Sequence, residues 1–215
     1  MSTHSSVPAV DDLIANLAAL PGSDSLFNPY RDALPGAVAR RDNLLRYLSD
    51  MLVRQPTHLM LFEAPGYCGC ALTGIPVTSE RIMLPGIPEW GLFGEGYRAT
   101  SDHPDGVSEH TATILWDALR AYADQPPLIW NTVPLHPHKP GNSQSNRPPL
   151  SAEQQMGLSY VEEIISLFAS ATILAVGRTA QRALEALGKP AISLRHPSQG
   201  GKPDFVRGLR EVYVR

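Results

Sequence analysis

The chain has 215 residues, of which 43% are hydrophobic, and this is enough apolar material for one sizeable core and a single domain. The net charge of −3 argues against a uniformly basic nucleic-acid-binding protein, and no apolar run reaches the roughly 18 residues that a membrane span needs. The N-terminal residues lack the basic segment of a signal peptide, so we expect a monomeric cytoplasmic protein with no membrane partner.

A helical N-terminal extension, residues 1–56, is predicted to pack on a core spanning residues 57–213. Asp11-Asp12 is suited to cap a helix that runs to about Leu20. A second helix is predicted over 37–54, because apolar residues recur there at three- and four-residue spacing.

The core alternates short apolar runs with helical patterns. The runs are typical of buried parallel strands, and they cover 57–62, 127–133, 172–176 and 191–194. The helices are predicted over 107–123, 151–169, 178–187 and 205–213, with Ser151 and Gln154 forming a capping box. This alternation predicts an α/β fold, a three-layer sandwich with a central four-stranded parallel sheet. The Gly- and Pro-rich stretch 63–106 is predicted to be a functional loop or to contain short helices.

Four loops leave the carboxyl ends of these strands, where open α/β sheets bind their ligands. Their polar side chains are Glu63, Asn131, Arg178 and His196, a set without the Asp and Ser partners of a hydrolase triad. An amide can donate to and accept from one edge of a planar heterocycle, and an imidazole can donate to an oxygen that gains charge. We therefore predict one pocket for such a ring, with the loops after 57–62 and 191–194 as opposite walls.

Four segments, taken in order, resemble the motifs of the uracil-DNA glycosylase superfamily: Glu63-Ala64-Pro65-Gly66, Thr73-Gly74-Ile75-Pro76, Asn131, and His196-Pro197-Ser198. The first motif is most similar to the branch that carries an iron–sulfur cluster, and so is the proline-rich stretch 137–149. The resemblance covers about residues 57–212. It implies a uracil-DNA glycosylase-like fold and an enzyme that flips uracil or a related deaminated base out of DNA and hydrolyses its N-glycosidic bond. It implies DNA at the nucleoid as the partner, with no metal and no cofactor.

The resemblance also implies roles for individual residues. His196 would donate to uracil O2, Asn131 would pair with N3–H and O4, and Glu63 would be the third catalytic residue. The base-binding pocket would include, besides these three, Ala64, Gly66, Tyr67 and Val77. Contacts to the DNA would come from Arg178, Ser198, Gln199, Gly200, Gly201 and Lys202.

The chain departs from the superfamily's patterns at several positions. The best-known branch has a water-positioning Asp where this chain has Ala64, and a Tyr that blocks the thymine methyl where it has Gly66. The cluster-bearing branch has an acid in place of Gly69 and a base-stacking Phe in place of Val77, and its four cluster cysteines are absent here. We therefore expect Glu63 or backbone carbonyls to hold the attacking water, in a pocket roomier than one strict for uracil.

Each of the three proposed catalytic residues also has a structural interpretation. His196 could bond a backbone carbonyl, Asn131 could cap its loop, and Glu63 could pair with Arg147 or Arg195. Two other functions stay open. A superfamily member that binds damaged or abasic DNA without cleaving it is favoured by the missing acids, and an α/β hydrolase or transferase could act on a small molecule.

Other side chains in the loops are assigned to structure or left open. Trp90, Phe93 and Tyr97 are predicted to pack under the long loop, and His136 and His138 to face solvent. Eight Lys or Arg residues follow Gly177, against three acids. This basic C-terminal quarter is either a phosphate-facing surface or a set of solvated helix faces.

Overall fold

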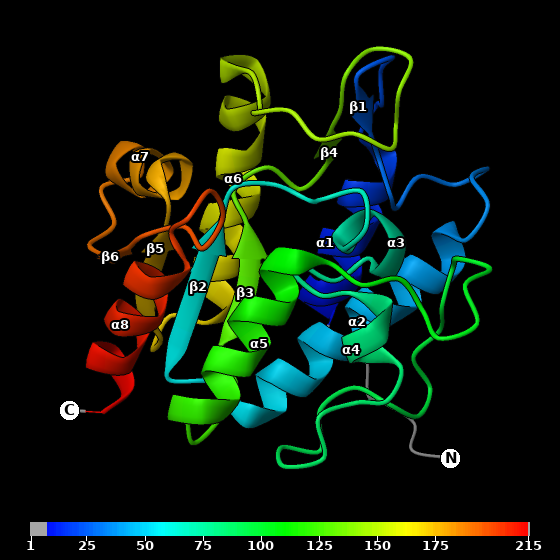
Figure 1. Ribbon diagram of the computed structural model, residues 1–215. Helices are drawn as coiled ribbons and strands as arrows, with labels where there is room; N and C mark the ends of the chain where they lie inside the picture. Colours follow the sequence, from blue (N-terminus) through cyan, green and yellow to red (C-terminus); the bar gives the residue numbers. More distant parts are fainter. Residues whose placement is uncertain (1–7, 215) are drawn as a thin grey trace.

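The computed structural model describes residues 8–214. Its main sheet has four parallel strands in the order β3-β2-β5-β6 (Figure 1). These strands are β2 (His58–Phe62), β3 (Leu128–Asn131), β5 (Thr172–Val176) and β6 (Ile192–Leu194). The predicted α/β fold with a four-stranded parallel sheet is therefore confirmed. In register, the last residue of β2, Phe62, lies beside the last residue of β3, Asn131.

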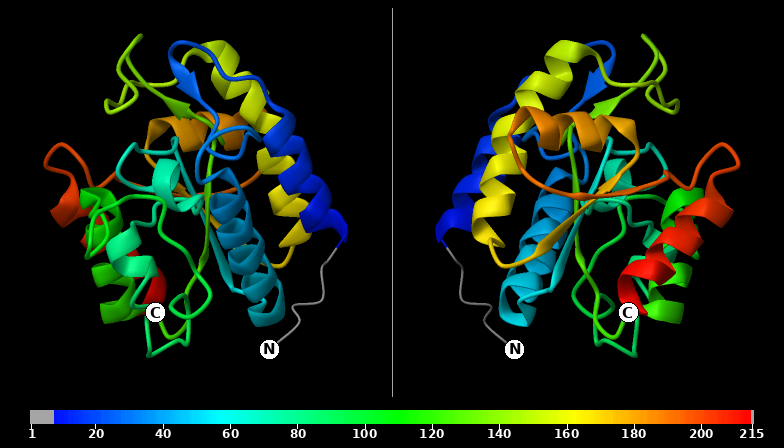
Figure 2. Two further views of the ribbon diagram at one scale, coloured as in Figure 1. Left: turned by 90° about the vertical axis from the view of Figure 1, so that its right-hand side faces the viewer. Right: turned by 90° about the vertical axis from the view of Figure 1, so that its left-hand side faces the viewer.

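Helices cover both faces of the sheet (Figure 2). On one face lie α5 (His110–Tyr122) and α8 (Lys202–Tyr213), and on the other lie α1 (Pro8–Ala19), α2 (Ala37–Arg54) and α6 (Ser151–Leu167). In the sheet, β3 lies on one side of β2 and β5 lies on the other, so the connection from β2 to β3 and the connection from β3 to β5 run in opposite directions. Because both crossovers are right-handed, their helices α5 and α6 lie on opposite faces. Buried residues of α1 and α2 belong to the same apolar cluster as those of the strands.

The direction of the crossovers also fixes where a ligand can bind. The connections that leave the neighbouring strands β2 and β5 go to opposite faces, which opens a crevice at the carboxyl ends of the strands. The helix α5, which connects β2 to β3, begins at this same edge. None of the helices in residues 8–214 combines the length and the apolar character that a membrane crossing requires.

Three helix starts, those of α1, α5 and α8, differ from the sequence predictions. The helix α1 begins at Pro8, so Asp11 lies in its first turn and is not its cap. The helix α5 begins at His110 rather than near Val107, because the Glu109 side chain accepts hydrogen bonds from the N–H groups of Thr111 and Ala112 and is the N-cap. A glutamate in this position is uncommon, since N-caps favour shorter side chains.

The predicted capping box of α6 is also wrong in its residues. Leu150 is the N-cap residue, and its N–H donates to the Glu153 carboxylate rather than to Gln154. Glu153 is held in this position by Arg147, whose guanidinium donates to both carboxylate oxygens at 2.8 and 2.6 Å. The last helix, α8, begins three residues earlier than predicted, at Lys202, with a proline in its first turn.

The fourth strand is less buried than predicted. Ile192 and Ser193 of β6 are exposed, because β6 is an edge strand with β5 as its one neighbour in the sheet, and only Leu194 is buried. The long stretch after β2 does contain short helices, α3 (Cys70–Thr73) and α4 (Glu80–Met83), as expected. Two further strands, β1 (Leu26–Phe27) and β4 (His136–Pro137), pair antiparallel in segments predicted as loops.

The aromatic side chains of the long loop pack as predicted. Tyr97 is buried, and Trp90 and Phe93 are partly buried against the main core. The Phe93 ring contacts Tyr97 and Trp116 edge-on, with ring centroids 5.4 and 5.3 Å apart. These side chains stabilise the loop from below.

Candidate active site

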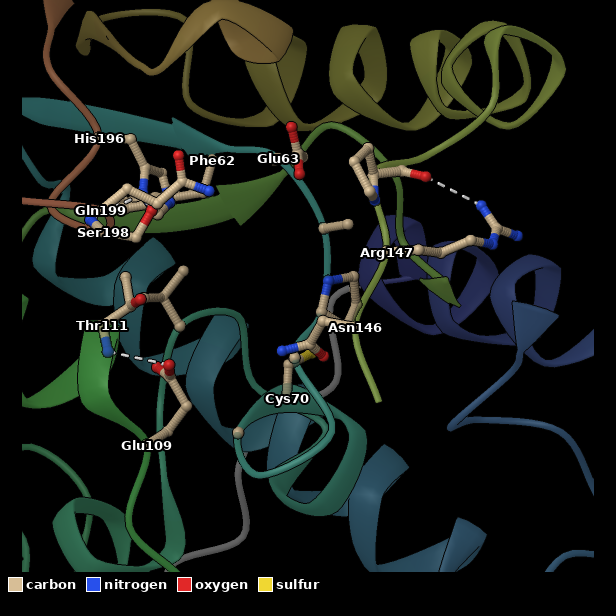
Figure 3. Close-up of a pocket in the computed structure, with 16 residues that line it drawn as sticks. Phe62, Glu63, Cys70, Glu109, Thr111, Asn146, Arg147, His196, Ser198 and Gln199 are labelled. Atoms are coloured by element: carbon tan, nitrogen blue, oxygen red, sulfur yellow. Dashed lines mark hydrogen bonds between the residues drawn. The ribbon is translucent and has the colours of Figure 1, made fainter. Parts of the chain in front are cut away.

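A cavity of about 370 Å³ lies at the carboxyl edge of the sheet (Figure 3). The loops after β2 and β6, which were predicted to form two walls of one pocket, both line it. The start of α5 and the segment before α6 complete it. Seven of the predicted site residues lie in its wall: Glu63, Ala64, Gly66, Val77, His196, Ser198 and Gln199.

His196 is held in one orientation and in one tautomer. Its Nδ1 accepts a hydrogen bond from the backbone N–H of Ser198 at 3.1 Å and lies 2.8 Å from the Ser198 hydroxyl. A backbone N–H can only donate, so in the neutral ring the proton resides on Nε2. Burial, and secondly the charge of Arg195, lower the pKa of His196. The cavity wall therefore contains a neutral imidazole that donates through Nε2.

A glycine allows His196 to reach across β5. Gly177 follows β5 with φ +85°, and a Cβ atom there would lie 3.2 Å from the Cβ of His196. Without that side chain, the loop after β6 crosses the end of β5 and the His196 ring meets Phe62 of β2 edge-on, with centroids 5.9 Å apart. The close approach thus brings an edge-strand residue to the centre of the sheet.

Asn131 does not lie in the cavity wall. The residue is 2% exposed, and its Oδ1 has no hydrogen-bond partner in the described part of the chain. Residues paired across neighbouring strands project from the same face of a sheet, so Asn131 projects on the same face as Phe62, which lines the cavity. A buried carbonyl oxygen without a partner is costly in a folded protein. This atom is a candidate acceptor for a ligand that enters beside Phe62.

Glu63 has a different partner from those considered from the sequence. One oxygen of its carboxylate accepts a hydrogen bond from the Thr179 hydroxyl at 2.5 Å, while Arg147 binds Glu153. Thr179 lies in the first turn of α7 (Arg178–Ala186), so a carboxylate already lies beside this helix start. Glu63 lines both the cavity and its neighbour, a cavity of about 680 Å³.

Val77 lines the cavity in a strained backbone conformation. Its φ of +44° is rare for a β-branched residue. Its carbonyl accepts a hydrogen bond from Trp116 Nε1 at 3.0 Å, which helps to hold this conformation. Backbone strain of this kind is often found at active sites and ligand-binding sites.

The predicted DNA-binding residues separate into two groups. Arg178, with Ser198 and Gln199, lines the neighbouring cavity, which shares His196 and Glu63 with the first. Gly200, Gly201 and Lys202 lie in neither wall. A Cβ atom on Gly201 would lie 2.1 Å from the His196 carbonyl oxygen, so this glycine shapes the turn after His196.

Tyr67 and the His136–His138 pair lie elsewhere. Tyr67 is partly exposed and lines a separate cavity. The prediction that His136 and His138 face solvent is wrong, since they are 1% and 6% exposed. Their segment packs against the rest of the protein, because β4 pairs with β1. The two nitrogens of His136 lie 2.8 and 3.2 Å from the carbonyl oxygens of Pro65 and Ser143. His136 therefore links the loop after β2 to the proline-rich segment.

Several lining residues were not predicted from the sequence. Glu109 and Thr111 come from the start of α5, and Asn146 and Arg147 come from the proline-rich segment. Asn146 accepts a hydrogen bond from the backbone N–H of Tyr67 at 3.2 Å and so supports the loop after β2. A usable signal existed for Glu109, because a helix that connects parallel strands begins at the edge where ligands bind.

Among residues 8–214, no three or more His, Cys, Asp or Glu side chains are grouped so that they could hold a metal ion. Comparison of the chain with protein-family models and with curated proteins gives no match.

Proposed function

We propose that the protein is a monofunctional DNA glycosylase that flips uracil or a related deaminated base out of DNA and hydrolyses its N-glycosidic bond. The observation that carries this proposal is the neutral His196 with its Nε2 proton in the cavity wall. A base leaves as an anion with charge on a ring carbonyl oxygen, and a fixed neutral donor stabilises that charge without first losing a proton. The motif resemblance adds support, because it assigns this residue the same task.

The other walls suit a flipped pyrimidine. Phe62 and Val77 offer apolar surface to the ring faces. Asn131 is not part of the wall, but its Oδ1, without a partner among residues 8–214, projects on the same face as Phe62 and is the acceptor that we assign to the N3–H of uracil. Cytosine has no proton on N3, so it would leave this oxygen unpaired. Arg178 and Arg195 in the neighbouring cavity supply positive charge for the DNA phosphates.

The proposed role of His196 predicts how activity depends on pH. Because its pKa is lowered below the ordinary 6.5 by burial and by Arg195, the neutral ring persists at pH values under 6.5. Uracil release should therefore decline only as the pH falls through this lowered pKa. In Arg195→Gln one of the two causes is removed, so the midpoint of the decline in kcat/KM should move up towards 6.5.

Arg182→Gln, at an exposed position of α7, is the matched control and should keep the wild-type midpoint. A midpoint that stays fixed or moves down in Arg195→Gln contradicts the assignment of His196 as the neutral donor.

Strand scission tests the function directly. Single- and double-stranded oligonucleotides with one uracil, hypoxanthine, xanthine, mismatched thymine or 5-hydroxymethyluracil are incubated with the protein and then treated with alkali, which cleaves at abasic sites. We expect scission at uracil. We also expect it at 5-hydroxymethyluracil, because the nearest atom to a Cβ built on Gly66 is Asn146 Oδ1 at 3.9 Å. Gly66→Tyr should lose the 5-substituted base first.

Binding without cleavage is the outcome that favours the second candidate, a protein that recognises abasic or damaged DNA. It is favoured by the absence of an acid at Ala64 and Gly69. Scission at none of the bases, on either strand form, would refute the glycosylase proposal.

A further inference from the structure

We propose that Glu109 is the carboxylate that acts on the sugar side of the reaction, holding the attacking water and stabilising the positive charge that develops on the deoxyribose. This inference rests on the proposed glycosylase function. It names a residue that neither the motifs nor their spacing indicated.

Glu109 lines the cavity with a charged side chain and is also the N-cap of α5. It lines the same cavity as His196, and Figure 3 shows the two residues on opposite sides of the open space, with the Glu109 carboxylate at the edge of that space and turned towards Thr111. A shorter Asp or Ser would cap α5 at least as well. The longer glutamate places a carboxylate in the cavity wall while it still reaches the backbone N–H groups.

The carboxylate is fixed from behind. Its two oxygens accept hydrogen bonds from the N–H groups of Thr111 and Ala112 at 2.9 and 2.6 Å. Each oxygen keeps further lone-pair capacity for a water molecule. A preorganised carboxylate needs no rearrangement when charge develops, so it stabilises a cationic sugar more than a mobile one does.

Gly69 provides the space that Glu109 occupies. A Cβ atom on Gly69 would lie 3.1 Å from Cγ and 3.5 Å from Cβ of Glu109. A side chain at position 69 would therefore require Glu109 to shift by a few tenths of an ångström. Position 69 is a glycine and not an acid, and the Glu109 side chain packs in the space that this glycine leaves.

Glu63, the other carboxylate of the cavity, is less suited to this task. Its carboxylate is bound by Thr179, a residue that lines the neighbouring cavity and not this one. It also comes from the loop that directly follows Phe62, whose ring contacts His196. A water molecule must attack the sugar from the side away from the leaving base, and hydrolases of glycosidic bonds place a carboxylate on that side.

The step balances without a co-reactant. The bond between C1′ and the base nitrogen breaks, and its electron pair leaves with the base, whose oxygen accepts a hydrogen bond from His196. The water oxygen bonds to C1′, and Glu109 takes the proton of that water and returns it to solvent. The base anion gains one proton from solvent, so the products are an abasic site and the free base.

A binding experiment tests the charge on the sugar side without turnover. Two duplexes are compared by fluorescence anisotropy: one carries a protonated pyrrolidine in place of the deoxyribose, and the other a neutral tetrahydrofuran. Wild type should bind the cationic duplex roughly tenfold to a hundredfold more tightly, as expected for a carboxylate close to a cation. Glu109→Ser, which keeps a good N-cap, should bind both duplexes equally and should unfold at the wild-type temperature.

Glu95→Ser is the matched control, because Glu95 is an exposed acid in the long loop after β2. This variant should keep the preference for the cationic duplex. Gly69→Ala should weaken the preference by displacing Glu109. A Glu109→Ser variant that still prefers the cationic duplex overturns the inference, as does a wild type that shows no preference. In either case scission at uracil still decides the proposed function separately. Failure of wild type to bind either duplex counts against both.

Discussion

Replacing His196 with alanine should slow uracil release by about a hundredfold to a thousandfold, the usual effect of removing a preorganised donor to a developing oxyanion. In the neutral ring the proton resides on Nε2, because the Ser198 N–H occupies Nδ1. Alanine removes this donor and leaves the leaving base without a partner for its charge. Affinity for uncleaved DNA should change little, since the hydrogen bond strengthens only as the bond to the base breaks. Single-turnover rates, with binding measured separately, check both expectations.

Ser198→Ala provides the matched control. It removes the hydroxyl that lies 2.8 Å from Nδ1 but keeps the backbone N–H that sets the tautomer. We therefore expect a loss of only several-fold, in line with one neutral hydrogen bond of about 1 kcal/mol. Equal rates for wild type and His196→Ala would show that this imidazole is structural.

The sequence predicted the sheet and the position of the cavity because both follow from periodicity and topology. Short apolar runs between helices specify parallel strands, and polar residues that follow such strands must gather at one edge. Glu63 and His196 were located in this way, and both line the cavity. The same reasoning did not place Asn131 correctly, since periodicity says nothing about which layer of side chains faces the open space.

The errors arise from contacts between distant segments. His136 is buried because the β1–β4 pair and the Pro65 carbonyl, 71 residues away, enclose it. Glu109 enters the wall because Gly69, 40 positions earlier in the numbering, leaves room for it. Neither neighbour can be inferred from local composition. The start of α5 also differs from the prediction because the Glu109 side chain accepts hydrogen bonds from the backbone of the first turn.

Replacing Asn131 with leucine should change activity and stability in opposite directions. The Oδ1 atom has no hydrogen-bond partner among residues 8–214, so an apolar side chain of similar size should raise the free energy of unfolding by about 1 kcal/mol. The same change removes the partner for N3–H of the base. The N3–H and the O4 of the bound base are then both unpaired, which should lower kcat/KM by about a hundredfold or more.

Asn43→Leu separates this prediction from a general effect of burying leucine. Asn43 is also fully buried, but its Nδ2 donates to the carbonyls of Thr73 and Arg98, each at 2.9 Å, and its Oδ1 accepts from the Arg98 N–H at 3.0 Å. Its replacement leaves these groups unpaired and should lower the free energy of unfolding by about 2–4 kcal/mol. Urea denaturation of both variants provides the comparison. If Asn131→Leu is destabilised as strongly as Asn43→Leu, the Asn131 amide stabilises the fold through its own contacts and is not reserved for a base.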